Sequence, residues 1–313
     1  MTSGTLLRLA LTPVVLVGVV LLAMLLPELT GVDSARSVLA VRYADAEPDP
    51  AVLAAIRADL GLDRPLPERV LDRLGRLCTG QLGASWLSGE PVGERIGRAF
   101  QVSIGIVVAA LVLSFVLGCA AGLVAARRPG SLVDRAVTGS TRLAAALPEF
   151  ALAPLLVAVF AVGLDLLPSS GWHGPHNAVL PVAALVPVLA APIAATMRAR
   201  AAAMARENFA VAAEARGIGR FRLWTRHIAK PALPAVLSVL TYNAAGMIAG
   251  TATVEVVFDL PGLGRTLVDA VIAQDLPVVQ VGLIVAVAMA LLVGALGDAL
   301  QLVVDPRTRR AAA

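Results

Sequence analysis

Three acidic residues lie within or at the end of apolar stretches, and they are the first candidates for chemistry. Glu149 interrupts one apolar run, whereas Glu255 and Asp259 flank the end of another, just before the turn Pro261-Gly262. A carboxylate inside a bilayer costs roughly 3 kcal/mol or more unless it faces water or a partner. We therefore interpret Glu149 as a candidate for lining a translocation path, and the stretch 255–262 as a candidate gate.

A simpler interpretation stays open for each of these acids. Glu149 could lie solvated near a membrane interface, where Pro148 bends its helix, or it could pair with a second subunit. Glu255 and Asp259 could be ordinary loop acids beside a structural turn, or they could attract the amino terminus of a peptide.

The chain has none of the common patterns of nucleotide-binding or hydrolytic enzymes. A P-loop needs Gly-Lys-Ser/Thr so that the lysine reaches the phosphates, and the only lysine, Lys230, is followed by Pro231. Gly-x-Ser-x-Gly and His-Glu-x-x-His do not occur. His173 and His176 have no third ligand near them in sequence, so loop histidines are favoured over a metal site. We predict that the chain is not an enzyme and binds neither a metal nor a cofactor.

The composition points to a membrane protein. Hydrophobic residues make up 58% of the chain and charged residues 15%, against roughly half and a quarter in soluble domains. The arginines lie between apolar runs, and aromatic residues are only 4%. Binding of single-stranded nucleic acid needs aromatic stacking platforms, so we expect a lipid membrane and no nucleic acid as a partner.

Six segments are long enough to cross a bilayer, which takes about 20 apolar residues. They are 9–27, 99–126, 143–164, 177–197, 231–254 and 276–297. The first could instead be a secretory signal, but its apolar run is too long and no clean cleavage site follows. Small residues such as those in 118–122 permit close helix packing. The predicted fold is an all-α integral membrane protein with six spans.

Arginine positions predict the orientation. Segments 127–142, 198–230 and 307–310 are rich in arginine and share one side of a six-span protein with Arg8. Because positive residues favour the cytoplasmic side, we expect both termini in the cytoplasm. The predicted parts are 1–27 with the first span, 28–98 outside, and the core 99–313.

The outside region carries two predicted short helices. Apolar residues recur at helical spacing in 51–60 and 66–77, and each stretch follows a proline or a proline-containing turn. So short a region buries little core of its own, and we expect these helices to lie at the mouth of the protein.

The cytoplasmic stretch 198–230 has a helical pattern of its own. Alanine-rich sequence predicts a helix over 199–216, then Gly217-Ile218-Gly219 breaks it, and a second amphipathic piece runs through Trp224. Glycine ends helices because it tolerates positive φ. A helix, a glycine corner and a second helix would form a rigid protrusion that can dock on a partner.

This stretch resembles the cytoplasmic signature of permease subunits of ATP-binding-cassette importers, which is Glu-Ala-Ala, three residues, then Gly. Ala212, Ala213 and Gly217 are in register, while Val211 occupies the glutamate position and a glutamate appears at Glu214. The resemblance implies that Arg206, Ala212, Ala213, Glu214 and Gly217 couple the chain to an ATPase.

Four further stretches resemble the oligopeptide, dipeptide and nickel branch of these permeases. They are LGLDRPL at 60–66, GQLGAS at 80–85, VEVVFDLPGLG at 254–264 and DPR at 305–307. The first span departs from the family, with Pro27-Glu28-Leu29-Thr30 in place of Pro-Gly-Asp-Pro.

The resemblance implies a set of partners and a mechanism. It predicts a second permease subunit, two ATPases that bind ATP and Mg²⁺, and an extracytoplasmic protein that delivers oligopeptides or dipeptides. Closure of the ATPases would move the 205–221 helices as levers. Nickel or another metal chelate is the alternative cargo. An ion-driven secondary transporter is the alternative function, although we see no inverted repeat of the kind that class shows.

Overall fold

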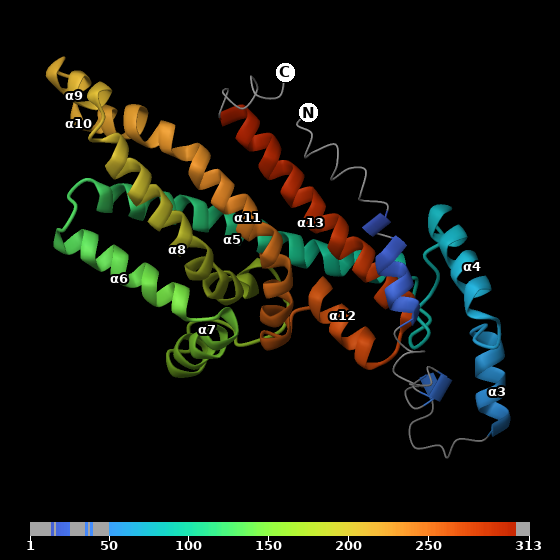
Figure 1. Cartoon of the computed structure of the whole chain (residues 1–313). Helices are drawn as coiled ribbons and strands as arrows, with labels where there is room; N and C mark the ends of the chain where they lie inside the picture. The colour runs from blue at the N-terminus through green and yellow to red at the C-terminus, as the bar shows by residue number, and fades with distance from the viewer. Residues whose placement is uncertain (1–13, 16, 26–34, 37, 40–49, 305–313) are drawn as a thin grey trace. The chain divides into compact units, whose positions relative to one another are not determined.

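The computed structural model describes residues 14–15, 17–25, 35–36, 38–39 and 50–304, and every structural statement below concerns these residues (Figure 1). They form helices and no β-strand; Ala84 and Pro91 make one isolated bridge. The helices are α3 (Pro50–Asp59), α4 (Leu66–Cys78), α5 (Val92–Ala126), α6 (Leu132–Ala146), α7 (Glu149–Leu156), η1 (Val157–Gly163), η2 (Pro175–Ala178), α8 (Val179–Met204), α9 (Asn208–Ala215), α10 (Arg220–Arg222), η3 (Leu223–Ala229), α11 (Lys230–Val257), α12 (Leu263–Ile272) and α13 (Leu276–Val304).

Three of the described helices are long and apolar enough to cross a membrane. They are α5, η2 with α8, and α13, and they contain the predicted spans 99–126, 177–197 and 276–297. The predicted span 231–254 forms one continuous helix, α11, but is not among these three. Much of the predicted span 9–27 lies outside the described residues. The all-helical membrane character is therefore confirmed, and the count of six stays a prediction.

The predicted span 143–164 is not one straight helix. Helices α6 and α7–η1 pass the same test only as a pair, bent by 103°. Leu147 at the bend has extended angles (φ −99°, ψ 112°) and precedes Pro148. Proline disfavours helical geometry in the residue before it, so Pro148 is the cause of the break.

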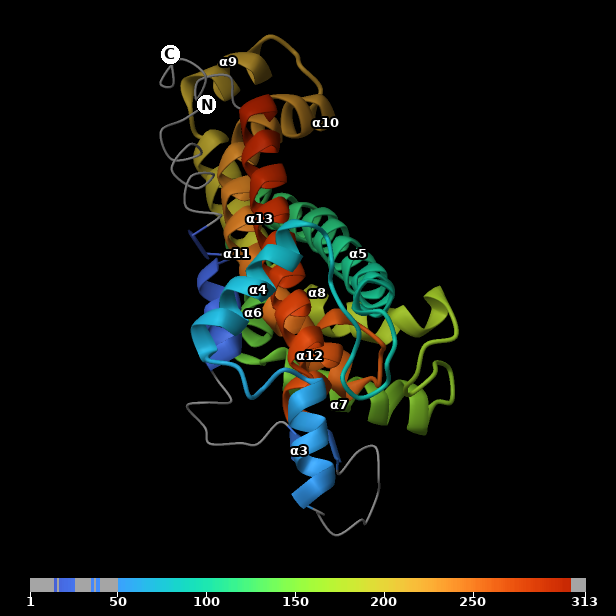
Figure 2. The ribbon, with the colours of Figure 1, turned by 90° about the vertical axis from the view of Figure 1, so that its right-hand side faces the viewer.

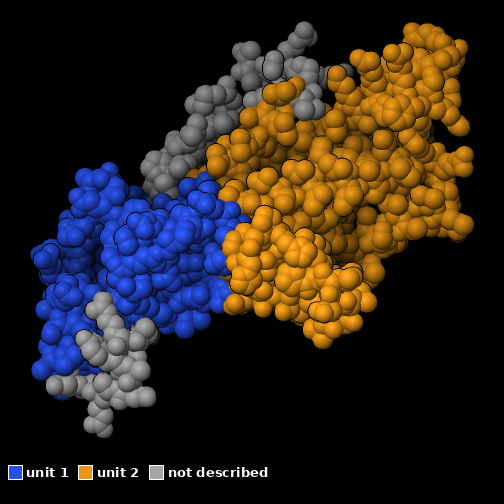
Figure 3. Space-filling view, turned by 180° about the vertical axis from the view of Figure 1, so that it is seen from behind, with its two compact units in different colours: residues 1–102, 261–288 blue, residues 103–260, 289–313 orange. Residues whose placement is uncertain are grey.

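The described chain forms two compact units, each taken here by itself (Figure 3). One unit comprises 1–102 with 261–288, and the other comprises 103–260 with 289–313. Helices α3 and α4 bear out the predicted helices at 51–60 and 66–77. The predicted outside region 28–98 thus shares its unit with α12 and the start of α13.

Within the larger unit, α5 and α8 touch backbone to backbone at two glycines. A Cβ on Gly118 would lie 2.6 Å from Ile193 Cγ2 and 2.9 Å from the Ala190 carbonyl oxygen. A Cβ on Gly122 would lie 2.8 Å from Met197 Cβ and would also collide with the Ala194 carbonyl oxygen. The small residues of 118–122 therefore do permit close packing, which is how membrane helices associate.

We expect Gly122→Ala to destabilise the protein, because a side chain there has no room. Overpacking costs roughly 1–3 kcal/mol, which lowers the Tm by roughly 5 °C in a chain of this size. The matched control is Gly105→Ala in the same helix, where a Cβ meets nothing within 4 Å. Thermal unfolding in detergent measures both. Equal Tm values for the two variants would contradict the close contact.

Candidate functional site

The segment between α8 and α11 folds as a helical elbow, which Figures 1 and 2 both place beyond the ends of α8 and α11. Its first break lies earlier than the sequence predicts, because α8 ends at Met204 and α9 begins at Asn208. Glu207 between them is extended (φ −72°, ψ 149°), as a residue that starts a new helix is. One helix over 199–216 is therefore wrong: alanine propensity does not report the bend at the polar residues 206–208.

The second corner of the elbow lies at Gly217, as predicted. Gly217 has φ +77°, its N–H donates to the Glu214 carbonyl (2.9 Å), and the Ile218 N–H donates to the Ala213 carbonyl (3.2 Å). This pair of bonds with a left-handed residue closes a helix in a Schellman motif. Glycine adopts that conformation without strain, and the chain then turns into α10.

The candidate coupling residues divide into an exposed and a buried group. Arg206, Ala212, Glu214 and Gly217 are exposed, whereas Ala213 is only 3% exposed. Ala213 belongs to a buried cluster drawn from α5, α8, η3 and α11, with Ala126, Ile193, Met197, Ala201, Leu223, Ile228, Ala232 and Val236. Ala213 therefore anchors the elbow to the long helices, and the other four residues face outward.

Two apolar residues enlarge the outward face of α9. Phe209 is 42% exposed and Val211 is 59% exposed. Sequence reasoning missed both as contact candidates because Val211 was weighed only as a departure from the glutamate of the motif. Singly exposed apolar residues are common on protein surfaces, so Phe209 and Val211 are additional candidates for a partner contact through their place on α9.

A buried ion pair joins α6 to α8 close to the elbow. The Asp134 carboxylate is 3% exposed and accepts from both Nε and Nη2 of Arg198, the second at 2.7 Å. The Gly130 N–H also donates to it (2.8 Å). Bidentate pairing of this kind fixes direction as well as distance, so it sets how α6 lies on α8. The sequence did not predict this ion pair, because it shows only that an aspartate lies in a segment rich in arginine.

Glu149 borders a cavity of about 390 Å³ between α7, α8 and α11. Its carboxylate is half-buried and lies over Gly250, where an added Cβ would be 3.0 Å from Oε1. Tyr242, which is 83% exposed, and Asn243 contribute polar groups. The full lining is Glu149, Leu185, Val188, Leu189, Tyr242, Asn243, Gly246, Met247 and Gly250. The cavity is consistent with the interpretation that Glu149 lines a path, and this interpretation stays a prediction.

Glu255 lies near the end of α11, and its role as a gate residue stays a prediction. It has no exposed area, and Ser103 Oγ donates to its Oε1 at 2.5 Å. Such hydrogen bonds lower the free-energy cost of burying a carboxylate. The structure therefore places Glu255 in the interior, so the interpretation as an ordinary loop acid is wrong.

The turn after α11 holds the other gate candidates. Asp259 is left-handed (φ +55°), and the Leu260 N–H donates to the Glu255 carbonyl (2.9 Å). This is the same helix-closing motif as at Gly217, with an aspartate in the position that glycine usually holds. Beyond it, Pro261 is exposed and Gly262 is the buried N-cap of α12.

In the smaller unit, Asp275 organises the loop before α5. Its side chain has no exposed area, and it accepts from Ser85 Oγ and from the Trp86 N–H, the latter at 3.0 Å. Arg95 Nη1 lies 3.8 Å away. Ser85 is the serine of the sequence motif at 80–85, so the network gives that motif a structural purpose that sequence reasoning did not identify.

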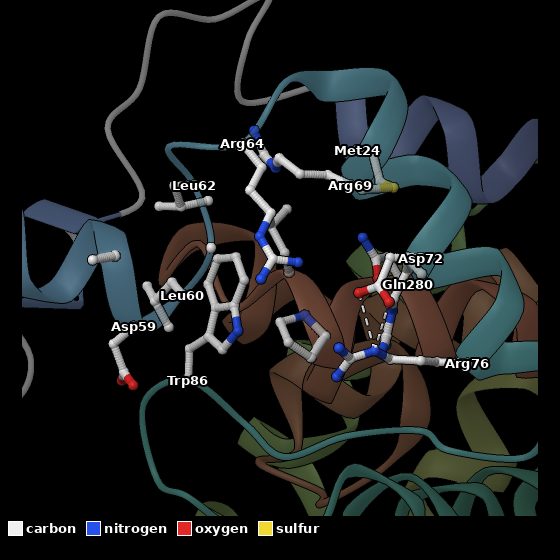
Figure 4. Close-up of a pocket in the computed structure, with 15 residues that line it drawn as sticks. Met24, Asp59, Leu60, Leu62, Arg64, Arg69, Asp72, Arg76, Trp86 and Gln280 are labelled. Atoms are coloured by element: carbon white, nitrogen blue, oxygen red, sulfur yellow. Dashed lines mark hydrogen bonds and ion pairs between the residues drawn. The ribbon is translucent and has the colours of Figure 1, made fainter.

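Arg73 joins α4 to α13 beside a pocket of about 260 Å³ (Figure 4). Its Nε donates to Gln280 Oε1 (2.5 Å) and its Nη2 to the Leu82 carbonyl (3.1 Å). Burial lowers the pKa of the Arg73 guanidinium, but arginine keeps its proton in proteins. The pocket is also lined by Arg64 before α4, by Arg69 and Asp72 of α4, and by Asp59 and Trp86, so it presents both signs of charge.

In the described part of the chain, no three His, Cys, Asp or Glu side chains are placed to hold a metal ion. The backbone N–H of His173 donates to Asn177 Oδ1 (3.2 Å), and His176 lies in η2. The two histidines are therefore parts of a structured loop.

Known proteins resemble most of this chain. The family described as binding-protein-dependent transport system inner membrane component matches residues 118–310. The oligopeptide transport system permease protein OppB of Haemophilus influenzae is 34% identical over 263 residues, which cover 83% of this chain and 86% of that protein. The OppB protein of Escherichia coli is 33% identical over 270 residues, with the same shares.

One further relative and one solved structure extend the comparison. The glutathione transport system permease protein GsiC of Pectobacterium atrosepticum is 33% identical over 303 residues, 96% of each chain. A chain from the inward facing conformations of the MetNI methionine ABC transporter has a TM-score of 0.58 at 17% identity, covering 69% of this chain and 99% of that chain. The structural likeness is one of fold.

We expect Asp275→Asn to loosen the loop at 85–89, because the neutral amide loses charge-assisted bonds from Ser85 and Trp86. Breaking a bond to a buried charged group costs roughly 1.5–3 kcal/mol. Hydrogen exchange at the amides of 85–89 should rise at least about tenfold. The control is Asp269→Asn, whose carboxylate is 55% exposed and should leave exchange there unchanged. Equal exchange in both variants would contradict the role of Asp275.

Proposed function

Because the chain belongs to the family of binding-protein-dependent transport system inner membrane components, we propose that it forms half of the membrane path of an ATP-driven peptide importer. The chain is a translocation subunit rather than an enzyme. Its partners would be a second permease subunit, two ATPases and an extracytoplasmic binding protein. ATP and Mg²⁺ would bind in the ATPases and not in this chain.

The proposed arrangement in the bacterial inner membrane has six spans with both termini in the cytoplasm. Arginine-rich segments at 127–142 and 198–230 support this orientation through the positive-inside rule. The region 28–98, with α3 and α4, then lies outside, where a binding protein would approach.

The observation that carries the proposal is the elbow formed by α9 and Gly217. Its outward face offers Ala212, Glu214 and the exposed Val211, while Ala213 is buried against α8 and α11. A partner that grips the outward face therefore moves the long helices with it. An ATPase dimer that binds the closed arrangement more tightly would shift the permease between its states by that difference in affinity.

Peptides are the proposed cargo. The similar proteins are named for oligopeptide and glutathione transport, and glutathione is itself a small peptide. The cavity beside Glu149 supports this choice, because a carboxylate next to Tyr242 and Asn243 can attract a peptide amino group. Nickel or another metal chelate is the second candidate, and it rests only on the sequence resemblance to the branch that includes nickel permeases.

Reconstitution tests the proposal directly. The complete complex in liposomes should take up a labelled dipeptide or oligopeptide only with its binding protein and ATP. Uptake driven by an ion gradient without ATP would instead identify a secondary transporter. Uptake of nickel with no peptide uptake would show that peptides are not the cargo, and it would still support an ATP-driven importer.

We expect Ala212→Leu and Ala213→Leu to fail in different ways. Leucine at 212 adds bulk to the outward face, so ATPase binding and ATP-driven uptake should fall at least about tenfold while the Tm of the isolated subunit stays unchanged. Leucine at 213 overpacks a buried site, so the Tm itself should fall by roughly 5 °C. Thermal unfolding, ATPase pull-down and uptake separate the two. Normal uptake by Ala212→Leu would contradict coupling through α9.

We expect Glu149→Gln to slow peptide uptake without disturbing assembly. A charge-assisted hydrogen bond contributes about 1.5–3 kcal/mol, and 1.4 kcal/mol is tenfold in rate or affinity. The uptake rate should therefore fall roughly tenfold, with ATPase binding intact. Glu68→Gln, an exposed acid in α4, is the control. An unchanged uptake rate for Glu149→Gln would contradict the path-lining interpretation and favour a solvated position near the membrane interface.

A further inference from the structure

A basic and apolar hollow of about 560 Å³ lies on the larger unit, apart from the outward face of α9. It is formed where α5 ends, where α6 begins, and along α10 and η3. Its lining is Val124, Arg127, Arg128, Ser131, Leu132, Val133, Arg220, Phe221 and Trp224. Three arginines and no acid line it, so it is built for an anion.

The positive charge of the hollow is not cancelled by the protein. In the described residues, no carboxylate lies within ion-pair distance of Arg127, Arg128 or Arg220, and Arg127 lies over the ring of Trp224 at 5.8 Å. The nearest acid in sequence, Asp134, is already held by Arg198 and by the Gly130 N–H. The three guanidinium groups thus keep donors available for a phosphate, which arginine recognises well.

The rest of the lining is apolar and exposed. Leu132 is 83% exposed, Phe221 is 77% exposed and Val133 is 51% exposed. A free phosphate ion would gain nothing from such side chains. A ligand that joins an anionic group to a hydrocarbon portion would cover both kinds of surface.

An apolar stripe leads away from the hollow along α5. The exposed residues Val108, Val112, Val116 and Val124 recur at multiples of four, and Ala120 between them is exposed as well. Positions four apart are neighbours on a helix surface and advance about 40° around the axis at each step, so these residues form a stripe that winds gradually around α5. The stripe runs along a helix that is apolar enough to span a bilayer, so it continues from the hollow toward the acyl-chain region.

The hollow lies at the end of a helix that is long and apolar enough to span a membrane, where lipid headgroups are expected. The spanning helix α5 ends at Ala126, immediately before Arg127 and Arg128, and the next apolar pair begins at Leu132. Tryptophan favours this interfacial level, and Trp224 forms one wall. Basic pockets between membrane helices on the cytoplasmic side bind anionic lipid headgroups.

We propose that this hollow is a binding site for an anionic phospholipid of the cytoplasmic leaflet. The phosphate contacts Arg127, Arg128 and Arg220, and one acyl chain lies along the exposed stripe of α5. The assignment rests on the proposed function only for the orientation that makes this side cytoplasmic. Because η3 follows α10 directly and leads into α11, a lipid here would contact the part of the elbow that joins these two helices.

Native mass spectrometry of the complete complex tests the site. Phosphatidylglycerol and phosphatidylcholine with identical acyl chains are the probes. The wild type should retain phosphatidylglycerol, and the double variant Arg127→Gln with Arg220→Gln should retain it about tenfold less strongly. The matched control is Arg135→Gln with Arg200→Gln, which removes the same charge from two exposed arginines outside the hollow and should retain the lipid as the wild type does.

Three results would overturn the proposal. They are equal retention by the two double variants, equal retention of the two lipids by the wild type, and displacement of the lipid by millimolar inorganic phosphate alone. Photoreactive phosphatidylglycerol on the unmodified complex gives a second measurement should the variant fail to assemble. It should label peptides that contain 124–133 and 220–224, and labelling elsewhere in the complex with none at these peptides would overturn the proposal.

The outcome can be separated from that of the proposed function. Lipid retention is measured without transport, whereas the importer assignment depends on ATP-driven peptide uptake by the same preparation. Retention without uptake would preserve the lipid site and refute the importer, and uptake without selective retention would do the reverse.

Discussion

The contact between the buried side of α9 and the ends of the long helices is the constraint on which the proposed coupling to an ATPase depends. A helix of eight residues is too short to be stable alone in water, and α9 has that length. The burial of Ala210 and Ala213 supplies the stabilisation that so short a helix lacks by itself. The small size of these residues lets α9 lie close to α8 and η3, so that a push on its outer face is not absorbed by side-chain rearrangement.

Buried acids hold connections in place within each of the two units. Asp134 orients α6 through Arg198, Glu255 is hydrogen-bonded to Ser103, and Asp275 gathers the loop of Ser85. Each pairing is costly to break once made, because removal of one partner leaves a buried polar group unsatisfied. Such pairings limit the number of alternative arrangements more than they raise stability. The proposed switching between two states would benefit from contacts that keep one geometry.

The sequence predicted the elements that depend on local rules and missed those that depend on distant partners. The helices at 51–60 and 66–77 and the corner at Gly217 follow from apolar spacing and from glycine conformation, and all are present. The interior position of Glu255 could not be predicted, because Ser103 lies 152 residues away in the chain. The bend at 206–208 was missed because propensity favours one continuous alanine-rich helix.

Glu149 differs from these buried acids in its exposure and in its neighbours, as expected of a residue that lines a path rather than one that holds helices together. Asp134, Glu255 and Asp275 are buried and receive donors from the chain itself. Glu149 is half-exposed, borders a cavity, and faces the Cα of Gly250 rather than a donor. Gly250 makes this position possible, because a Cβ there would lie 3.0 Å from Oε1 of Glu149 and a larger side chain would collide with the carboxylate. The lack of a side chain at Gly250 therefore leaves space for Glu149 at the edge of the cavity.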